Sequence, residues 1–287
     1  MTKMKNIIKF FFGKTFSGEK FVNSLIANLI GLQIFRYIAG KILYKIKYVF
    51  YKDKNFSLPK NGYIVLENFL PDNEFLLLHD EFNLAVKDEN FSQKYNDYGQ
   101  GVEAVHVYLD EKIKNKYHNL YKFSKNEKII SFFTNNELKK KLNIVVKLEE
   151  LKTKKKSEDD LTKIFHYDAY YNTFKAWFYL QDVSIEQGPL NYVESSLNFS
   201  LSRLFDEWKA SIKYSLLKNK KDYYEYGVSS KKYDYYNNIS KKFTVKKNTL
   251  VFANTHALHR RGDAISDTQR NTIHFYSREN PFKILFN

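Results

Sequence analysis

The stretch Phe165-His166-Tyr167-Asp168 contains a His-x-Asp pair, and the segment His256-Ala257-Leu258-His259 follows about ninety residues later. On a strand, residues two positions apart point to the same face, so His166 and Asp168 can reach one ion. Two imidazoles and one carboxylate on one side of a metal ion leave its other side open for substrates. We therefore expect a mononuclear metal site built from this pair and one distal histidine.

Two histidines compete for the third ligand position. The segment 249–254 is typical of a strand, and continued alternation would place His256 and His259 on opposite faces. Only one of them should therefore be a ligand, and composition does not choose between them.

Arginine is rare in this chain, and four of its six arginines fall between residues 260 and 278. Arg270 follows His259 by eleven residues, across a Gly262-Asp263 turn. A strand, a turn and a return strand bring residues at this spacing close together. A guanidinium binds a carboxylate through two parallel hydrogen bonds. Arg270 is therefore predicted to hold the remote carboxylate of a co-substrate whose other end chelates the metal, with a surface position as the competing interpretation.

Three stretches resemble the phytanoyl-CoA dioxygenase family of iron(II)- and 2-oxoglutarate-dependent oxygenases. They are 165–168, FKAWFYLQDV at 174–183 followed by Gly188-Pro189-Leu190, and NTHALHRRG at 254–262 with Arg270. The resemblance covers roughly residues 60–280. One departure is Glu194-Ser195-Ser196-Leu197, which stands where the family commonly has Pro-Gly-Ser-His. This change bears on substrate recognition more than on the metal ligands.

The resemblance implies that His166, Asp168 and His259 hold Fe(II) and that Arg270 binds 2-oxoglutarate. The His-to-Arg spacing of the family selects His259 over His256. Trp177 is predicted as a further cofactor-binding residue, with core packing as its competing role. Oxygen is the other co-substrate, and the reaction implied is hydroxylation of an unactivated C–H bond. The alternative is an inactive relative that binds a ligand or a membrane surface without turnover.

The fold implied is mainly β with flanking helices (α+β): a double-stranded β-helix, or cupin-like jelly roll, behind an N-terminal helical extension. We place the extension at 1–57 and the domain at 58–287, with an insertion at 221–242. Apolar spacing predicts helices over 3–12, 19–51, 74–86, 112–152 and 200–220. Short β-rich runs predict strands at 63–66, 101–109, 173–180, 190–193, 243–245, 249–254 and 271–277.

The segment 19–51 combines apolar residues at helical spacing with lysines toward its end. Its uncharged run is short and polar for a bilayer span. A basic amphipathic helix can lie in the membrane interface, and it can equally pack on the domain or on a second subunit. The sequence leaves these alternatives open.

The composition of the chain limits the classes of partner and metal site that we expect. The chain has 287 residues, no cysteine and a net charge of +15. The absence of cysteine excludes thiolate metal sites and fits a reducing, cytoplasmic compartment. The charge suits an anionic small molecule, a lipid, a saccharide precursor or a membrane surface. No nucleic-acid motif accompanies it, so no nucleic-acid partner is expected.

Overall fold

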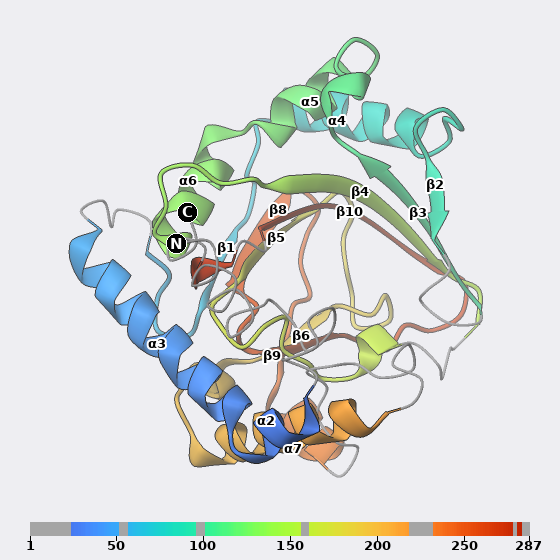
Figure 1. Cartoon of the computed structure of the whole chain (residues 1–287). Helices are drawn as coiled ribbons and strands as arrows, with labels where there is room; N and C mark the ends of the chain where they lie inside the picture. The colour runs from blue at the N-terminus through green and yellow to red at the C-terminus, as the bar shows by residue number, and fades with distance from the viewer. Residues whose placement is uncertain are drawn as a thin grey trace.

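Two antiparallel β-sheets face one another, and helices cover their outer sides (Figure 1). The computed structural model describes residues 24–51, 57–95, 101–155, 161–217, 232–277 and 280–282. Within these ranges the larger sheet has the strand order β1-β8-β5-β10-β4-β3-β2, and the smaller has β7-β6-β9.

The strands are β1 Tyr63–Leu66, β2 Gln93–Tyr95, β3 Val102–Tyr108, β4 Val145–Thr153, β5 Phe174–Tyr179, β6 Leu190–Val193, β7 Lys241–Lys242, β8 Thr249–Asn254, β9 Leu258–Arg261 and β10 Thr268–Ser277. The helices are α2 Leu25–Leu29, α3 Leu32–Phe50, α4 Asp72–Ala85, α5 His118–Ser124, α6 Glu127–Glu137, α7 Leu201–Leu216 and α8 Tyr233–Ile239. Short 3-10 turns are η1 Glu111–Ile113, η2 Leu161–Lys163 and η3 Glu194–Leu197.

Strand alternation divides the larger sheet into two chemically different faces. Its outer face is apolar and packs against α4, α5 and α6, as the contact of Phe252 with Phe133 illustrates. Its inner face turns toward the smaller sheet and carries polar residues beside a second, aromatic core that includes Trp177 and Tyr179. Buried polar groups are retained where they have partners or a ligand to bind. The inner face is therefore the place to look for chemistry.

Helix α3 packs on the domain with a polar and aromatic face. Gln33, Arg36, Tyr37 and Gly40 are buried there, next to α7 and the loop before β5. The predicted helix over 19–51 is interrupted at Gly31, whose φ of 98° is a left-handed conformation that favours glycine. Residues 3–12 lie outside the described residues. In the described part of the chain, no helix is long and apolar enough to cross a membrane.

The strand predicted at 243–245 was misplaced, because β7 lies at Lys241–Lys242 and Val245 forms only an isolated bridge with Val183. The segment 112–152 was expected to be mostly helical, yet its last part forms β4. The sequence around Leu148-Glu149-Glu150-Leu151 has good helix formers, so local propensity favours a helix. In the fold, β4 lies between β10 and β3, and Leu148 is buried in the outer core. Pairing with two strands and burial override the local preference.

Candidate metal centre

The first and last of the predicted metal ligands are joined through their backbones. The N–H of His166 donates to the carbonyl oxygen of His259 at 3.0 Å, and the N–H of His259 donates to that of His166 at 3.0 Å. This isolated antiparallel bridge ties the segment before β5 to strand β9. The two imidazole centroids consequently lie 4.4 Å apart. Residues 93 positions apart in sequence are thus held as immediate neighbours.

Both imidazoles have the same orientation. The Nδ1 atom of His166 lies 2.7 Å from the carbonyl oxygen of Ile164, and that of His259 lies 3.0 Å from the carbonyl oxygen of Ala257. A backbone acceptor at Nδ1 fixes the tautomer that leaves Nε2 as the ligand atom. Burial, together with the adjacent His259, lowers the pKa of His166 to about 3. His166 is therefore neutral near pH 7, as a metal ligand must be.

Asp168 completes a three-residue cluster. Its Oδ1 atom lies 4.0 Å from Nε2 of His166 and 3.8 Å from Nε2 of His259. One candidate ligand atom from each residue fits within 4.8 Å of the others. These separations are too long for hydrogen bonds. They suit three ligands that surround one ion at about 2.0–2.2 Å each.

Lys175 forms an ion pair with the carboxylate of this cluster. Its Nζ atom lies 2.7 Å from Oδ2 and 3.0 Å from Oδ1 of Asp168. The lysine comes from the inner face of β5. Because the Asp168 side chain is only 2% exposed, its charge needs compensation inside the protein. The lysine supplies that compensation, and it donates its hydrogen bond to Oδ1, the oxygen that also lies nearest Nε2 of both histidines.

Arg270 lies on β10, on the same inner face, and is 8% exposed. Its Nη1 donates to the carbonyl oxygen of Gly188, and its Nη2 lies 3.9 Å from Oε1 of Glu149. Its Nε has no hydrogen-bond partner among the described residues. The backbone of Gly188 packs tightly against that of Gly262, since a Cβ at position 188 would lie 2.7 Å from the carbonyl oxygen of Gly262. A buried guanidinium with spare donor capacity is suited to an anionic ligand.

Alternation along β5 places three inner-face side chains in a row between the metal cluster and Arg270. Lys175 contacts Asp168, Trp177 follows it, and Tyr179 comes next and interacts with Arg270. Burial raises the pKa of Tyr179 to about 12, so it remains a hydroxyl that can donate a hydrogen bond. Trp177 is 9% exposed and meets His274 edge-on at 6.3 Å. It belongs to the core between the sheets, and it also lies between the metal cluster and Arg270.

A buried charged cluster surrounds Glu149 on β4. Its carboxylate lies 3.1 Å from Nε2 of His106, 3.0 Å from Nζ of Lys147 and 3.4 Å from Nε2 of His274. Burial alone would raise the pKa of Glu149, but His274, Lys147, His106 and Arg270 together hold it well below its usual range. The Glu149 carboxylate is therefore ionised, and it partly neutralises the positive charge of Arg270.

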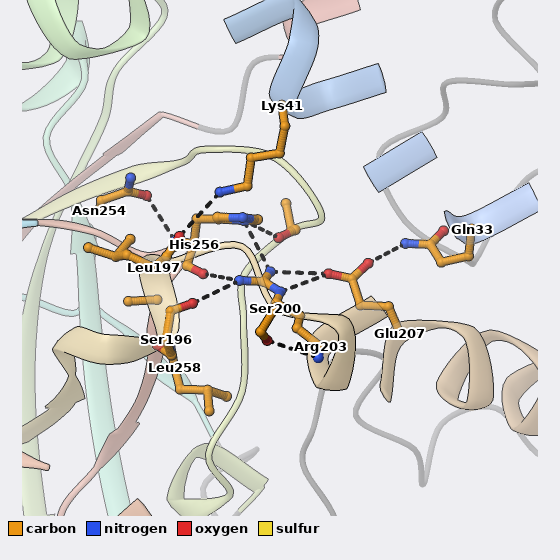
Figure 2. Close-up of polar contacts among 12 residues, drawn as sticks. Gln33, Lys41, Ser196, Leu197, Ser200, Arg203, Glu207, Asn254, His256 and Leu258 are labelled. Carbon is orange, nitrogen blue, oxygen red and sulfur yellow. Dashed lines mark hydrogen bonds and ion pairs between the residues drawn. The ribbon is translucent and has the colours of Figure 1, made fainter. Parts of the chain in front are cut away.

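His256 lies in a different environment, shown in Figure 2. Nη1 of Arg203 donates to its carbonyl oxygen at 2.7 Å, and its ring stacks on Tyr37 at 5.7 Å. Arg203 in turn binds Glu207 through Nε and Nη2, each at 3.1 Å. Burial, followed by Arg203 and Lys41, lowers the pKa of His256 well below its usual range. The structure does not bring His256 into the metal cluster.

Sequence reasoning missed two parts of this site. Tyr179 could have been found, because it shares the inner face of β5 with Lys175 and Trp177 by simple alternation. Glu149 was missed because its segment was interpreted as a helix. His106 and His274 carried no local signal, since only the pairing of β3, β4 and β10 places them beside Glu149.

Comparison with known proteins supports the fold. No protein-family model matches the chain. No curated protein sequence matches it either. Among solved structures, the chain is similar to the epimerase SnoN in complex with Fe3+, alpha ketoglutarate and nogalamycin RO. That match has 15% identity, covers 84% of this chain and 83% of SnoN, and has a TM-score of 0.50.

Two further solved structures are less similar. One is HygX from Streptomyces hygroscopicus with nickel, 2-oxoglutarate and hygromycin B bound, at 14% identity, 75% and 82% coverage and a TM-score of 0.43. The other is a Pseudomonas putida prolyl-4-hydroxylase, at 10% identity, 76% and 92% coverage and a TM-score of 0.46. The likeness to SnoN confirms the predicted double-stranded β-helix with flanking helices. No match singles out the phytanoyl-CoA dioxygenase family, so that narrower resemblance stays a prediction.

Proposed function

We propose that this protein is an iron(II)- and 2-oxoglutarate-dependent oxygenase that acts on a C–H bond of a small organic molecule. The observation that carries the proposal is the convergence of His166, Asp168 and His259 on one point, on the same inner face as the buried Arg270. Metal ligands and a carboxylate-binding arginine are the two features that such a co-substrate requires.

The donor set fits iron(II). Two neutral imidazoles and one carboxylate form the facial triad that binds this ion and leaves positions open for substrates. The backbone carbonyls at Nδ1 of both histidines supply the outer contacts that orient metal-bound imidazoles. Oδ1 of Asp168 lies nearest Nε2 of both histidines, and it accepts a hydrogen bond from Nζ of Lys175. In our proposal, His166, Asp168 and His259 hold the metal, and Lys175 compensates the charge of the buried carboxylate.

We assign Arg270 to the distal carboxylate of 2-oxoglutarate. Its Nη1 is anchored on the Gly188 carbonyl oxygen, so the guanidinium is fixed before the ligand arrives. Its Nε is buried and has no hydrogen-bond partner in the described structure. A carboxylate there would satisfy this donor, and Tyr179 could add a hydroxyl contact. Trp177, in the row between the metal cluster and Arg270, would pack against the body of the co-substrate.

Iron(II) with 2-oxoglutarate and oxygen, when bound, supplies an oxidation that converts a C–H bond to an alcohol with release of succinate and carbon dioxide. The protein itself binds, orients and excludes water. The metal-facing side chains are almost fully buried, and the aromatic core around Trp177 and Tyr192 seals the space between the sheets. A water-poor site strengthens each polar contact within it.

Further assignments extend this proposal. We infer that 58–287 is the catalytic domain, with 1–57 as an added extension and 221–242 as an insertion. The substrate class we favour is a small molecule, a lipid or a lipid-linked saccharide, and the location is cytoplasmic at a membrane surface. The net charge of +15 supports an anionic substrate or surface.

The test is anaerobic addition of iron(II) and then 2-oxoglutarate to the purified protein. We expect a weak visible charge-transfer band, because a 2-oxoacid that chelates iron(II) absorbs there. Asp168→Ala should lose the band, since one ligand is gone. Arg270→Met should retain the band but require much more 2-oxoglutarate to develop it. The absence of any band in the wild-type protein would overturn the proposal.

An inactive relative would give a different result. It would bind iron(II) and 2-oxoglutarate, and it would release no succinate when oxygen is admitted with any candidate substrate. We expect slow succinate release even without substrate, and loss of that release in the Asp168→Ala control.

A further inference from the structure

Helix α3 buries polar groups on the side that packs against the domain. Gln33 is fully buried and donates from Nε2 to Glu207 at 2.7 Å. Arg36 is fully buried with its guanidinium 4.4 Å from the centre of the Tyr170 ring, and Tyr37 is fully buried and stacks on His256. Leu32 is buried on the same helix, and Ile34, Ala39 and Leu43 pack against the core. An amphipathic helix on a soluble protein keeps its polar groups outside, so the burial of Gln33 and Arg36 departs from that arrangement.

The opposite face of α3 is apolar and exposed. Its side chains recur at steps of three and four residues, so they form one continuous stripe along the helix. The stripe consists of Phe35 (53% exposed), Ile38 (38%), Ile42 (53%), Ile46 (49%) and Val49 (72%). The preceding helix α2 adds Ile26 (74%), Leu29 (50%) and Ile30 (83%). We refer to these eight residues as the outer stripe. An exposed apolar surface of this extent marks a binding surface.

Helix α7, on which α2 and α3 pack, also exposes apolar side chains (Figure 1). It exposes Leu201, Phe205 and Leu216 at 67%, 54% and 62%. Trp208 of this helix donates from Nε1 to the carbonyl oxygen of Asn28 at 2.8 Å, which ties it to α2. The apolar exposure therefore belongs to a group of packed helices and not to one isolated segment.

Charge identifies the partner. The sequence from residue 24 to 51 contains no aspartate or glutamate, and Glu19 is the only acidic residue among the first 51. Lys45 on α3 and Lys209 and Lys213 on α7 are exposed. Isoleucine and phenylalanine beside lysines fit the acyl chains and anionic headgroups of a lipid bilayer. Two copies of this face would instead bring their lysines together, which like-charge repulsion opposes.

We propose that α2, α3 and α7 form a docking surface that lies on an anionic membrane, with the outer stripe in the interface and the lysines at the headgroups. From Phe35 to Val49 the stripe is about 21 Å long at 1.5 Å per residue. This surface is independent of the proposed metal centre, and it accounts for apolar exposure that the oxygenase function leaves unexplained.

The experiment is vesicle co-sedimentation of the full chain, with neutral phosphatidylcholine vesicles and with vesicles that contain phosphatidylglycerol. We expect the wild-type protein to bind the anionic vesicles at least about tenfold better than the neutral ones. The triple variant Ile38→Ser, Ile42→Ser, Ile46→Ser should lose about tenfold or more of that binding, since interfacial affinity scales with buried apolar area. Lys45→Glu with Lys209→Glu and Lys213→Glu should remove the preference for anionic lipid.

A matched control comes from α4. This helix exposes Leu76, Leu77 and Leu84 at 57%, 53% and 62%, but it begins with Asp72 and Glu74. The triple Leu→Ser variant there should bind vesicles like the wild type, and thermal melting should show that both triple variants remain folded. The proposal would be overturned if the wild-type protein did not bind anionic vesicles, or if the outer-stripe variant bound them as well as the wild type does. So would a wild-type dimer in light scattering that the same variant converts to monomers.

Discussion

His256 and His259 stand three residues apart, and the fold places them in two polar clusters with different internal geometry. Around His256, neighbouring groups meet at hydrogen-bond distances, as in the contact of 2.7 Å from Arg203 to its carbonyl oxygen (Figure 2). Around His259, the side-chain ligand atoms approach only to 3.8–4.0 Å. The first cluster is joined by hydrogen bonds between its own members, and the second is spaced for an ion.

The comparison gives a criterion for separating structural polar networks from binding sites. Arg203, Glu207 and Gln33 form a connected chain in which each charge is compensated by another side chain. In the metal cluster, Nε2 of His166, Nε2 of His259 and Oδ1 of Asp168 converge on one point, and none of these three atoms hydrogen-bonds to another. Acceptors that converge without bonding to one another favour a cation, whereas paired donors and acceptors favour stability.

Replacing each of the two histidines by alanine should give the largest difference in metal affinity between two variants. His259→Ala should weaken Co2+ binding at least about 100-fold, because removing a ligand costs more than removing an outer contact. His256→Ala should bind Co2+ within about threefold of the wild type. Isothermal titration of each metal-free variant measures this. Equal losses in the two variants would show that the clusters are one site.

Breaking the structural network should reduce stability and leave metal affinity unchanged. Glu207→Ala leaves the buried Arg203 without its carboxylate partner, which typically costs about 3–5 kcal/mol. The free energy of unfolding from urea denaturation should fall by that amount, while the Co2+ affinity stays within about threefold. A stable variant with weakened metal binding would contradict the separation of the two clusters.

Acid should destabilise the protein through buried histidines outside the metal cluster. The pKa of His274 is lowered to about 3, chiefly by burial, and that of His256 is lowered well below its usual range. Below pH 6.5 the unfolded chain takes up protons that the folded chain does not, so stability falls as pH falls. Each such histidine should cost about 2 kcal/mol between pH 7 and 5.

Urea denaturation of the metal-free protein at the two pH values measures this loss. Glu149 faces His274 with a pKa well below its usual range, and Lys41 lies near His256 with a pKa lowered to about 8, so both stay ionised over this window. His274→Gln should lose less stability between pH 7 and 5 than the wild type. An unchanged pH dependence in that variant would count against a buried neutral His274.

Removing the lysine beside Asp168 should produce the smallest effect, and it should strengthen metal binding. Lys175→Met leaves the buried carboxylate without a counter-charge and removes a positive charge close to the ion. We expect the variant to bind Co2+ about tenfold more tightly and its metal-free form to melt at a lower temperature. Lys175→Arg is the control that preserves the charge. Weaker Co2+ binding by Lys175→Met would mean that Lys175 mainly orients Asp168.

Much of the fold was readable from the sequence. Strands β5, β6 and β8 and the helix over 200–220 were predicted close to their observed bounds, since clear periodicity of two or of about 3.6 residues marks them. Strand β9 was not predicted, and β7 lies at Lys241–Lys242 instead of the predicted 243–245. The His-x-Asp pair, with its two-residue spacing, was also evident. In contrast, β4 was misassigned, because its local preference for helix opposes the pairing that its neighbours impose.

Spacing and periodicity in the sequence showed where the apolar stripes run and identified His166 and Asp168 as one half of a site. Alternation did not choose between His256 and His259, and only the family resemblance favoured His259. The folded chain supplies the physical reason: a backbone bridge between His166 and His259, 93 positions apart in sequence, brings His259 to the pair, while His256 faces Arg203.

The same division applies to α3. Its periodicity predicted an apolar face, and the folded chain leaves most of that face exposed while it buries Leu32 together with Gln33, Arg36 and Tyr37. Periodicity reports that a helix has two chemically distinct sides. Which side packs against the domain depends on the side chains that it contacts there, in this case Glu207, Tyr170 and His256.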